Sequence, residues 1–423
     1  MSFDTEHTRL LTPEVVIFGS GVAGLWLANR LHRLGYQVLV FEKSRLGGIQ
    51  TMASQGMIHG GMKYTLGGAL SGASEAIAAM PQHWRQCLCG EGEVDLRQTR
   101  ILSDYFFLWS GETLGSRLTG FFASKLIRGR VEAVDEVHRP SLLRHPEFTG
   151  SLYRVGDMVL DVPSLITDLA RPLEHRLLQL PEQARLHREA DGRIAIHCPL
   201  PGESLLLRPR HIVLAAGEGN ETLLQQLDIT RPAMQRRPLQ QVMVKHSHLH
   251  RFYGHCLGNG STPRVTISSH PTADGRMVWY LGGQLAEEGA NRSAEELITF
   301  ARAELADLMP WLDFSDAEWA TLPVQRAEPR QPGLARPDNA WLSQVPGIPN
   351  LLVGWPTKLT LAPNMANQAL ALLQQQTPRP TSSHDPALLA LAALLPPPPL
   401  AHTPWDEAFP PSPFEVPESD DSP

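Results

Sequence analysis

A strand, a glycine-rich turn, a helix and a second strand follow one another at the start of this 423-residue chain. Val15–Phe18 is a short apolar run, typical of a strand buried on both faces of a sheet. The hexapeptide Gly19–Gly24 follows directly, then an amphipathic segment at Leu25–Leu34, then a second strand at Gln37–Phe41. This order predicts an α/β fold with a Rossmann-like, dinucleotide-binding start.

Each part of the pattern has a physical role in binding a dinucleotide. Gly19 permits a tight turn, Gly21 lets a pyrophosphate approach the backbone, and Gly24 lets the helix pack closely on the strand. Free N–H groups at the helix start attract phosphate. Glu42 stands where a carboxylate binds ribose hydroxyls and repels a 2′-phosphate, which disfavours NADP. The pattern alone does not separate NAD from FAD, because both contain ADP.

After Glu42 the chain enters a glycine-rich polar stretch instead of completing a plain βαβ unit. Its second part reads Ser54-x-x-x-Ile58-His59-Gly60-Gly61-x-Lys63-Tyr64. This segment resembles the second flavin-binding motif of the D-amino-acid-oxidase superfamily of FAD oxidoreductases. In detail it is similar to the FAD-dependent glycerol-3-phosphate dehydrogenases, and a looser version occurs in L-2-hydroxyglutarate oxidases. Further segments that fit this resemblance are Met158–Pro163, Ile212–Gly217, Asn350–Gly354 and Thr357–Thr360.

The resemblance implies a discontinuous Rossmann-like FAD domain and an α+β substrate domain with an antiparallel sheet. We place the FAD domain at 1–65, 156–224 and 336–376, the substrate domain at 66–155 and 225–335, and a proline-rich acidic tail at 377–423. The best strand signals of the second insert are Leu239–Leu249, Arg264–Ser268 and Met277–Leu281, with an Asp274-Gly275 turn between the last two.

Two departures separate the chain from the glycerol-3-phosphate enzymes. Trp355-Pro356 stands where those enzymes have glycines, and their extra helical domain is lacking. The resemblance nevertheless implies a set of FAD-binding positions. These are Gly19, Gly21, Val22, Ala23, Gly24, Glu42, Lys43, Gly48, Gln50, Thr51, Ser54, Met57, Ala216, Gly217, Gly354, Lys358, Leu359 and Thr360.

The same resemblance suggests residues for the chemistry. Lys358 would place a cation near the flavin C2=O and N1, where negative charge develops on reduction. His248, in Val-Lys-His-Ser-His, or His59 would act as the base, and Tyr64 and Arg276 would hold the substrate. Each of these residues also has a simpler interpretation. Arg276 would be a solvent-exposed arginine, His248 would belong to a polar strand edge, and His59 would only cap a glycine turn.

Histidines 246, 248 and 250 alternate, so on a strand they share one face and could bind a metal. No second cluster of ligands accompanies them, and we predict no metal. The Cys87-x-Cys89 pair is too short for a CxxC motif. With only four cysteines in the chain, this favours a reducing compartment over a disulfide framework.

Charge and hydropathy limit the partners. The net charge is -7, and the part from Pro378 onward carries most of it, with seven acidic residues and one arginine. A nearly neutral body lacks the basic footprint of a nucleic-acid-binding protein. The N-terminus has no secretory pattern, and the longest apolar run, Ala387–Leu395, is about half of what a membrane span needs. We therefore expect a cytoplasmic protein, or one peripheral to a membrane.

The tail allows two interpretations. It contains a leucine–alanine helix near Ala387–Leu395, four consecutive prolines and a disordered acidic end. Trp405, Phe409 and Phe414 could anchor a protein partner, or the tail could fold back on its own domain.

Together these features predict an FAD-dependent dehydrogenase or oxidase that takes a hydride from a small anionic hydroxy or amino compound. Oxygen or a quinone would reoxidise the flavin. The alternatives are an amine or amino-acid oxidase of the same superfamily, and a non-catalytic flavin-binding accessory protein that uses its tail for interaction.

Overall fold

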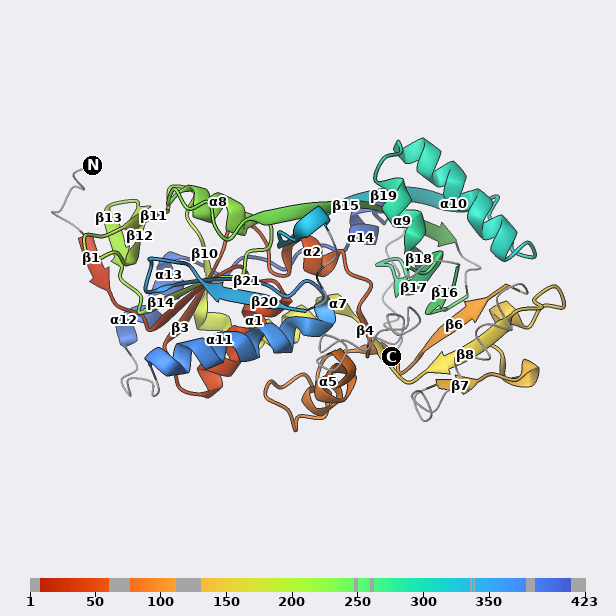
Figure 1. Ribbon diagram of the computed structural model, residues 1–423, viewed down its shortest axis with the longest axis horizontal. Coiled ribbons are helices and arrows are strands. Elements are labelled where there is room, and N and C mark those ends of the chain that lie inside the picture. The colour runs from red at the N-terminus through yellow and green to blue at the C-terminus, as the bar shows by residue number, and fades with distance from the viewer. Residues whose placement is uncertain are drawn as a thin grey trace, which may run out of the picture.

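Two large β-sheets lie side by side in the computed structural model (Figure 1). The structure describes residues 8–60, 77–111, 131–246, 250–258, 262–334, 337, 339–377 and 385–411. The sequence-based prediction of an α/β chain with a mostly parallel sheet and an antiparallel one is confirmed.

The first sheet has the strand order β10-β3-β2-β14-β21-β20. Its strands run parallel except β20, which pairs antiparallel with β21. The central strands are apolar runs with no exposed residue, as expected where helices and a second layer cover both faces. Their bounds are β2 Val15–Phe18, β3 Val38–Glu42, β10 Leu177–Gln179, β14 His211–Leu214, β20 Trp341–Gln344 and β21 Leu351–Trp355.

Helix α1 (Val22–Arg33) begins three residues before the predicted start. Gly21 is extended and serves as its N-cap, and the Thr51 hydroxyl accepts from the first N–H of the helix, that of Val22. Bonding within the helix begins with the Leu25 N–H, which donates to the Gly21 carbonyl, so the Ala23 and Gly24 N–H groups have no partner inside the helix. On one face of the sheet α1 packs with α7 (Val162–Ala170) and α11 (Ala362–Gln376) in a single apolar core.

The opposite face of this sheet packs against a small four-stranded sheet. It contains β1 (Thr8–Leu11), β11 (Arg185–Arg188), β12 (Ile194–Leu200) and β13 (Glu203–Leu207). Leu186, Ile196 and Leu205 belong to the resulting core.

The second sheet has the order β19-β15-β18-β17-β16-β6-β8-β7. Strands β15, β17 and β18 pair antiparallel as predicted, and Gly275, with φ +79°, forms the expected turn between the last two. Helix α10 (Ala294–Leu308) covers one face. The strand bounds are β6 Phe106–Ser110, β7 Val131–Ala133, β8 Ser151–Val155, β15 Met234–His246, β16 Gly254–Cys256, β17 Val265–Pro271, β18 Met277–Gly282 and β19 Glu318–Pro329.

A third, three-stranded sheet contains β4 (Met57–Ile58), β9 (Met158–Leu160) and β5 (Ile101–Ser103). β4 carries the chain out of the glycine-rich stretch and pairs antiparallel with β9. Met57 and Val159 pack in one apolar cluster with β6 and β8 of the second sheet. The glycine-rich stretch is thereby brought against the second sheet.

The described part of the tail, 385–411, folds back on its own chain. It forms α12 (Pro386–Leu389) and α13 (Leu391–Leu394) in place of one predicted helix, then α14 (Pro404–Ala408). Trp405 and Phe409 are buried in the chain itself, so they are not available as partner anchors. Phe414 and the acidic end lie outside the described residues.

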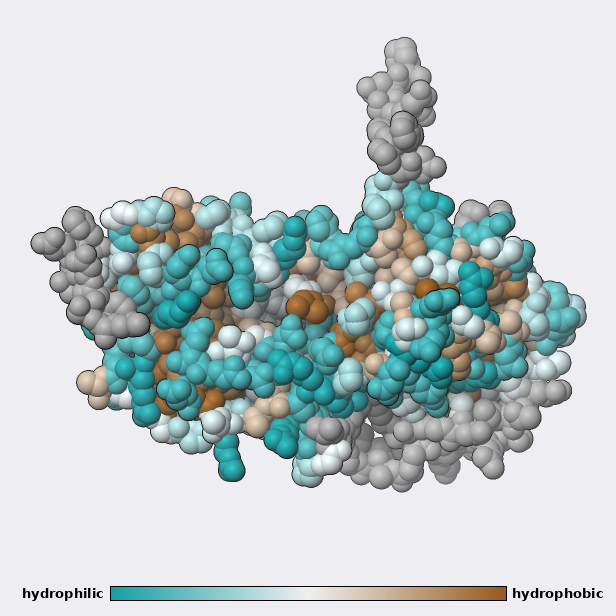
Figure 2. Space-filling model, turned by 90° about the horizontal axis from the view of Figure 1, so that it is seen from above, coloured by the Kyte–Doolittle hydropathy of each residue, from teal (hydrophilic) through white to brown (hydrophobic). Residues whose placement is uncertain are grey.

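Hydrophilic residues cover most of the face shown in Figure 2, with hydrophobic ones scattered among them. Among the described residues, no helix is both long and apolar enough to cross a bilayer.

Candidate functional site

The glycine turn after β2 is too tightly packed for side chains at two positions. Gly19 has φ +104°, and a Cβ there would lie 2.6 Å from the Ala215 carbonyl oxygen. A Cβ on Gly24 would lie 2.0 Å from the Gly19 carbonyl oxygen. The turn therefore requires glycine for close packing of α1 on the strands, as the motif predicts.

Glu42, at the end of β3, is held beside this turn. Its Oε2 accepts hydrogen bonds from the Ser20 backbone N–H at 3.0 Å and from the Ser20 hydroxyl at 2.8 Å. Its Oε1 accepts from the Ser44 N–H at 3.0 Å. The carboxylate is only half-buried, so it can accept a further hydrogen bond at the mouth of the turn. The next residue, Lys43, is exposed.

The glycine-rich segment 46–55 crosses the start of α1. The Gly47 N–H donates to the Ser20 carbonyl at 3.0 Å, and the Val22 N–H donates to Thr51 Oγ1 at 3.2 Å. Helix α2 (Gly48–Met52) begins here, and among the described residues no atom comes within 4 Å of where a Gly48 Cβ would be. Segment 46–55 and the glycine turn are thus bonded to each other, and together they form one cradle around the start of α1.

The loop after β14 closes another side of the cradle. Ala216 N–H donates to Asn220 Oδ1 at 2.8 Å, and Asn220 Nδ2 donates to the Gly354 carbonyl at 3.1 Å. A Cβ on Gly217 would lie 3.1 Å from Gln50 Oε1, which places segment 46–55 against this loop. Trp355, one of the departures from the glycerol-3-phosphate enzymes, donates from Nε1 to the Gly217 carbonyl at 2.9 Å and so braces the loop.

Beyond the cradle, β4 meets the start of α11. The Thr360 hydroxyl accepts from the His59 N–H at 3.3 Å and donates to the Met57 carbonyl at 3.4 Å. His59 is buried. Lys358 is half-buried and is the N-cap of the short 3₁₀ helix Leu359–Leu361, which leads into α11. The structure therefore brings His59 to Thr360, about 300 positions further along the chain, and Lys358 lies two residues before Thr360.

The face of the second sheet beside Met57 supplies side chains that sequence reasoning missed. Tyr253 packs with Met57 and Phe106 in the same apolar cluster. Its hydroxyl is buried and has no hydrogen-bond partner in the part of the chain that the structure describes, and burial raises the pKa of Tyr253 to about 12. His255, two positions on, lies edge-on to Phe106 and shares a 2.8 Å hydrogen bond between Nδ1 and Thr266 Oγ1. In the sequence, Tyr253, His255 and Leu257 stand at every second position. This spacing was the one signal that could have marked their side chains as sharing a face of a strand.

Of the residues predicted for the chemistry, His248 and Tyr64 lie outside the described residues. Arg276 forms ion pairs instead: its Nη2 lies 2.8 Å from Asp274 Oδ2 and its Nη1 lies 3.3 Å from Glu318 Oε1. Because these two carboxylates already engage its guanidinium, we infer that Arg276 does not hold the substrate.

Among the residues that the structure describes, no group of three or more histidines, cysteines or carboxylates could hold a metal ion. His246 is the last residue of β15. His250 Nδ1 lies 3.1 Å from the Ser141 hydroxyl.

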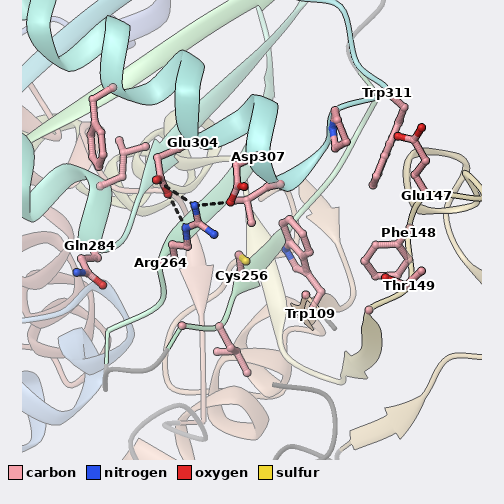
Figure 3. A pocket seen from close by; sticks show the side chains of 18 of the residues that line it. Trp109, Glu147, Phe148, Thr149, Cys256, Arg264, Gln284, Glu304, Asp307 and Trp311 are labelled. Carbon is pink, nitrogen blue, oxygen red and sulfur yellow. Dashed lines mark hydrogen bonds and ion pairs between the residues drawn. The ribbon is translucent and has the colours of Figure 1, made fainter. Parts of the chain in front are cut away.

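A cavity of about 830 Å³ lies on the other face of the second sheet, under α10 (Figure 3). Arg264 crosses it and pairs with Glu304 at 2.6 Å and with Asp307 at 2.7 Å. Trp109 and Cys256 belong to its lining. Their neighbours in the strands, Leu108 and His255, point to the opposite face, because successive side chains of a strand alternate between faces. The cavity therefore lies across the sheet from Met57, and its lining includes none of the predicted cofactor residues.

Comparison with known proteins gives consistent results. The family model for FAD dependent oxidoreductases matches residues 14–355. A probable FAD-dependent oxidoreductase of Pseudomonas aeruginosa, PA4991, is 48% identical over 402 residues, covering 95% of this chain and 99% of that protein. Its crystal structure aligns with a TM-score of 0.79 at 43% identity, covering 95% of this chain and 99% of that one.

Two more distant structures share the fold. Iminodiacetate oxidase from Chelativorans sp. BNC1 aligns with a TM-score of 0.62 at 17% identity, covering 92% of this chain and 100% of that one. L-α-glycerophosphate oxidase from Mycoplasma pneumoniae, with FAD bound, aligns with a TM-score of 0.64 at 16% identity, covering 86% and 95%.

Proposed function

The chain belongs to the family of FAD dependent oxidoreductases, and from that membership we propose that it oxidises a small anionic amino or hydroxy compound. FAD is its cofactor. The single observation that carries the substrate class is the buried, unpartnered hydroxyl of Tyr253 beside Met57.

The cradle has the properties that FAD requires. Two of its glycines admit no Cβ, and bonding within α1 begins only with the Leu25 N–H, so the Ala23 and Gly24 N–H groups have no partner inside the helix. We propose that Gly21–Ala23 and segment 46–55 hold the pyrophosphate and that Glu42, with Lys43 beside it, receives the adenosine ribose. The flavin end would then extend toward Met57, Gly354 and Thr360.

Bound FAD would supply a hydride acceptor at the flavin N5 and a reduced ring that carries negative charge. We propose that the Lys358 ammonium, at the start of α11, stabilises that charge. His59 or His248 would take the proton of the substrate O–H or N–H group. His59 is held in place by its N–H bond to Thr360.

The Tyr253 hydroxyl defines what the substrate offers. A buried hydroxyl without a partner costs about 1–3 kcal/mol, so the position favours a ligand that pairs with it. With a pKa of about 12 the group stays protonated near neutral pH and is able to donate a hydrogen bond to a ligand. A carboxylate or phosphate oxygen is the strongest acceptor for such a donor. Since the surrounding face is buried and apolar, we infer a small substrate that carries one such anionic group.

Amines and alcohols remain the two substrate classes to compare. The name of iminodiacetate oxidase indicates a secondary amine with carboxylates. The name of L-α-glycerophosphate oxidase indicates an alcohol with a phosphate, in line with the motif resemblance. Both compounds combine a small skeleton with an anion, as the Tyr253 argument requires.

An anaerobic screen tests the proposal. Small amino acids, secondary amino acids, hydroxy acids and polyol phosphates are added to the oxygen-free holoprotein, and the flavin absorption is followed. We expect bleaching by members of one class and by none of the same compounds with the anionic group esterified. FAD binding without bleaching by any of them would contradict the proposal and favour an accessory role.

Paired variants separate the two proposed roles. His59→Ala should lower the rate of flavin reduction by about 10²–10⁴-fold if His59 is the base, with little change in KM. Tyr253→Phe should mainly raise KM, by roughly 10-fold for the loss of one hydrogen bond to a charged group. Stopped-flow reduction at several substrate concentrations measures both. An unchanged rate in His59→Ala would transfer the base assignment to His248, which the same substitution tests.

A further inference from the structure

The C-terminal part of the chain passes directly over the proposed cofactor segment. We define residues 396–409 as the C-terminal strap. The Leu46 N–H donates to the Pro399 carbonyl at 2.8 Å, and the Ala401 N–H donates back to the Leu46 carbonyl at 2.9 Å. Leu46 and Leu400 form a parallel β-bridge. The strap is therefore bonded through its backbone to the first residue of segment 46–55.

The strap then anchors on the second sheet. Trp405, at the start of α14, is 2% exposed. Its ring stacks on His270 with centroids 4.1 Å apart and meets Tyr280 edge-on at 5.9 Å. The Asp406 carboxylate accepts from the Ala273 N–H at 3.1 Å. In Figure 1, α12 and α13 lie by the parallel sheet and α14 lies by the second sheet, so the strap joins the two.

The residue beneath Trp405 holds the other end of the same segment. The Tyr280 hydroxyl donates to the Ala53 carbonyl at 3.1 Å. Gln55 Nε2 donates to the Tyr280 carbonyl at 2.8 Å. Segment 46–55 is thus held by the strap directly at Leu46 and through Tyr280 at Ala53 and Gln55.

We propose that the C-terminal strap is a positioning element for the cofactor, with Trp405 as its anchor residue. Segment 46–55 closes the cradle over α1, so FAD leaves only when this segment moves away. The strap resists that movement in two ways. Its backbone bonds hold Leu46 directly. Its Trp405 packs on Tyr280, which in turn holds Ala53 and Gln55. The inference rests on the proposed assignment of segment 46–55 to FAD, and it does not depend on which substrate is oxidised.

The experiment compares two tryptophan substitutions in the full-length holoprotein. Trp405→Ala removes the anchor, and Trp311→Ala is the matched control. Trp311 lies on the α10 side of the second sheet, where its Nε1 donates to the Leu142 carbonyl at 3.0 Å. The readouts are the rate of FAD release after dilution, followed by flavin fluorescence, and amide hydrogen exchange in residues 46–55.

Trp405→Ala should release FAD roughly 5- to 150-fold faster than the parent, the usual range for coupled elements, and should raise exchange in 46–55. Trp311→Ala should change neither readout, although it lowers the melting temperature. Equal release rates in parent and Trp405→Ala, or equal acceleration by the two substitutions, would overturn the proposal.

A second variant preserves the test if Trp405→Ala fails to fold. Ala401→Pro deletes the N–H group that binds the Leu46 carbonyl and adds a ring on a half-buried residue. It should accelerate FAD release in the same direction, and an unchanged release rate would overturn the role of the strap. A parent protein that binds no FAD would instead refute the cofactor assignment, so the two failures are distinguishable.

Discussion

Gly24→Ala should yield a protein that folds poorly around its glycine turn and binds FAD up to roughly 100-fold more weakly, from a packing cost of about 1–3 kcal/mol. The added Cβ would lie 2.0 Å from the Gly19 carbonyl oxygen, and neither backbone can yield without moving α1 off β2. Moving α1 displaces the Val22 N–H, which binds Thr51, and with it the cradle. FAD titration of the apoprotein measures the loss.

Gly111→Ala is the matched control for that substitution. No atom of the described residues lies within 4 Å of where its Cβ would be, and its φ is not in the left-handed region. It should bind FAD like the parent. If Gly24→Ala retained the parental affinity, the glycine turn would not be the dinucleotide site.

The second large effect concerns stability. Lys245→Met should lower the free energy of unfolding by about 3 kcal/mol, the lower end for breaking a buried ion pair. Lys245 is 1% exposed, and its Nζ donates to Asp274 Oδ2 at 2.6 Å. Arg276→Met should cost only about 0–1 kcal/mol, because its side chain is 40% exposed. Urea unfolding at neutral pH compares the two variants.

The pH dependence of this effect has a definite sign. Burial alone would raise the pKa of Asp274, but hydrogen bonds from Lys245, Thr272 and Arg276 outweigh it and hold that pKa well below the ordinary value. A lowered pKa contributes stability that is fully present above about pH 3.9, the pKa of an unfolded aspartate. That stability is lost as the pH falls through the folded pKa. The difference in the free energy of unfolding between the parent and Lys245→Met should therefore become smaller in strong acid, where Asp274 is protonated.

Arg276→Met also tests the inference that Arg276 does not hold the substrate. Arg276→Met should leave the KM for the identified substrate unchanged. A large rise in KM with stability intact would return Arg276 to the substrate site.

Local patterns in the sequence were enough to predict the glycine turn and Glu42 beside it, whereas segment 46–55 and the loop after β14 were assigned to FAD by the resemblance to a known family. The glycines of the turn, the buried strands and Glu42 lie within thirty residues, so their contacts follow from short-range geometry. The hairpin at Asp274–Gly275 was predictable for the same reason. The bond from His59 to Thr360 joins distant segments, and only the resemblance to a known family singled out both residues.

Other features depended on packing that the sequence does not encode locally. Tyr253 became informative only when the order of the second sheet placed it beside Met57. The sequence Asp-Gly-Arg is the same whether its arginine faces a substrate or pairs with Asp274. In the structure Asp274 pairs with both Arg276 and the buried Lys245, which favours the ion-pair network. Leucines and Trp405 in a proline-rich tail suit either a partner or the chain itself, and only the contacts with Leu46 and His270 distinguish them.

The flavin content of the purified protein tests the central claim most directly. Denaturing a known amount of protein and measuring the released flavin should give close to one FAD per chain, and the native protein should be yellow. A colourless protein that releases no flavin and takes up none when FAD is added would contradict the account.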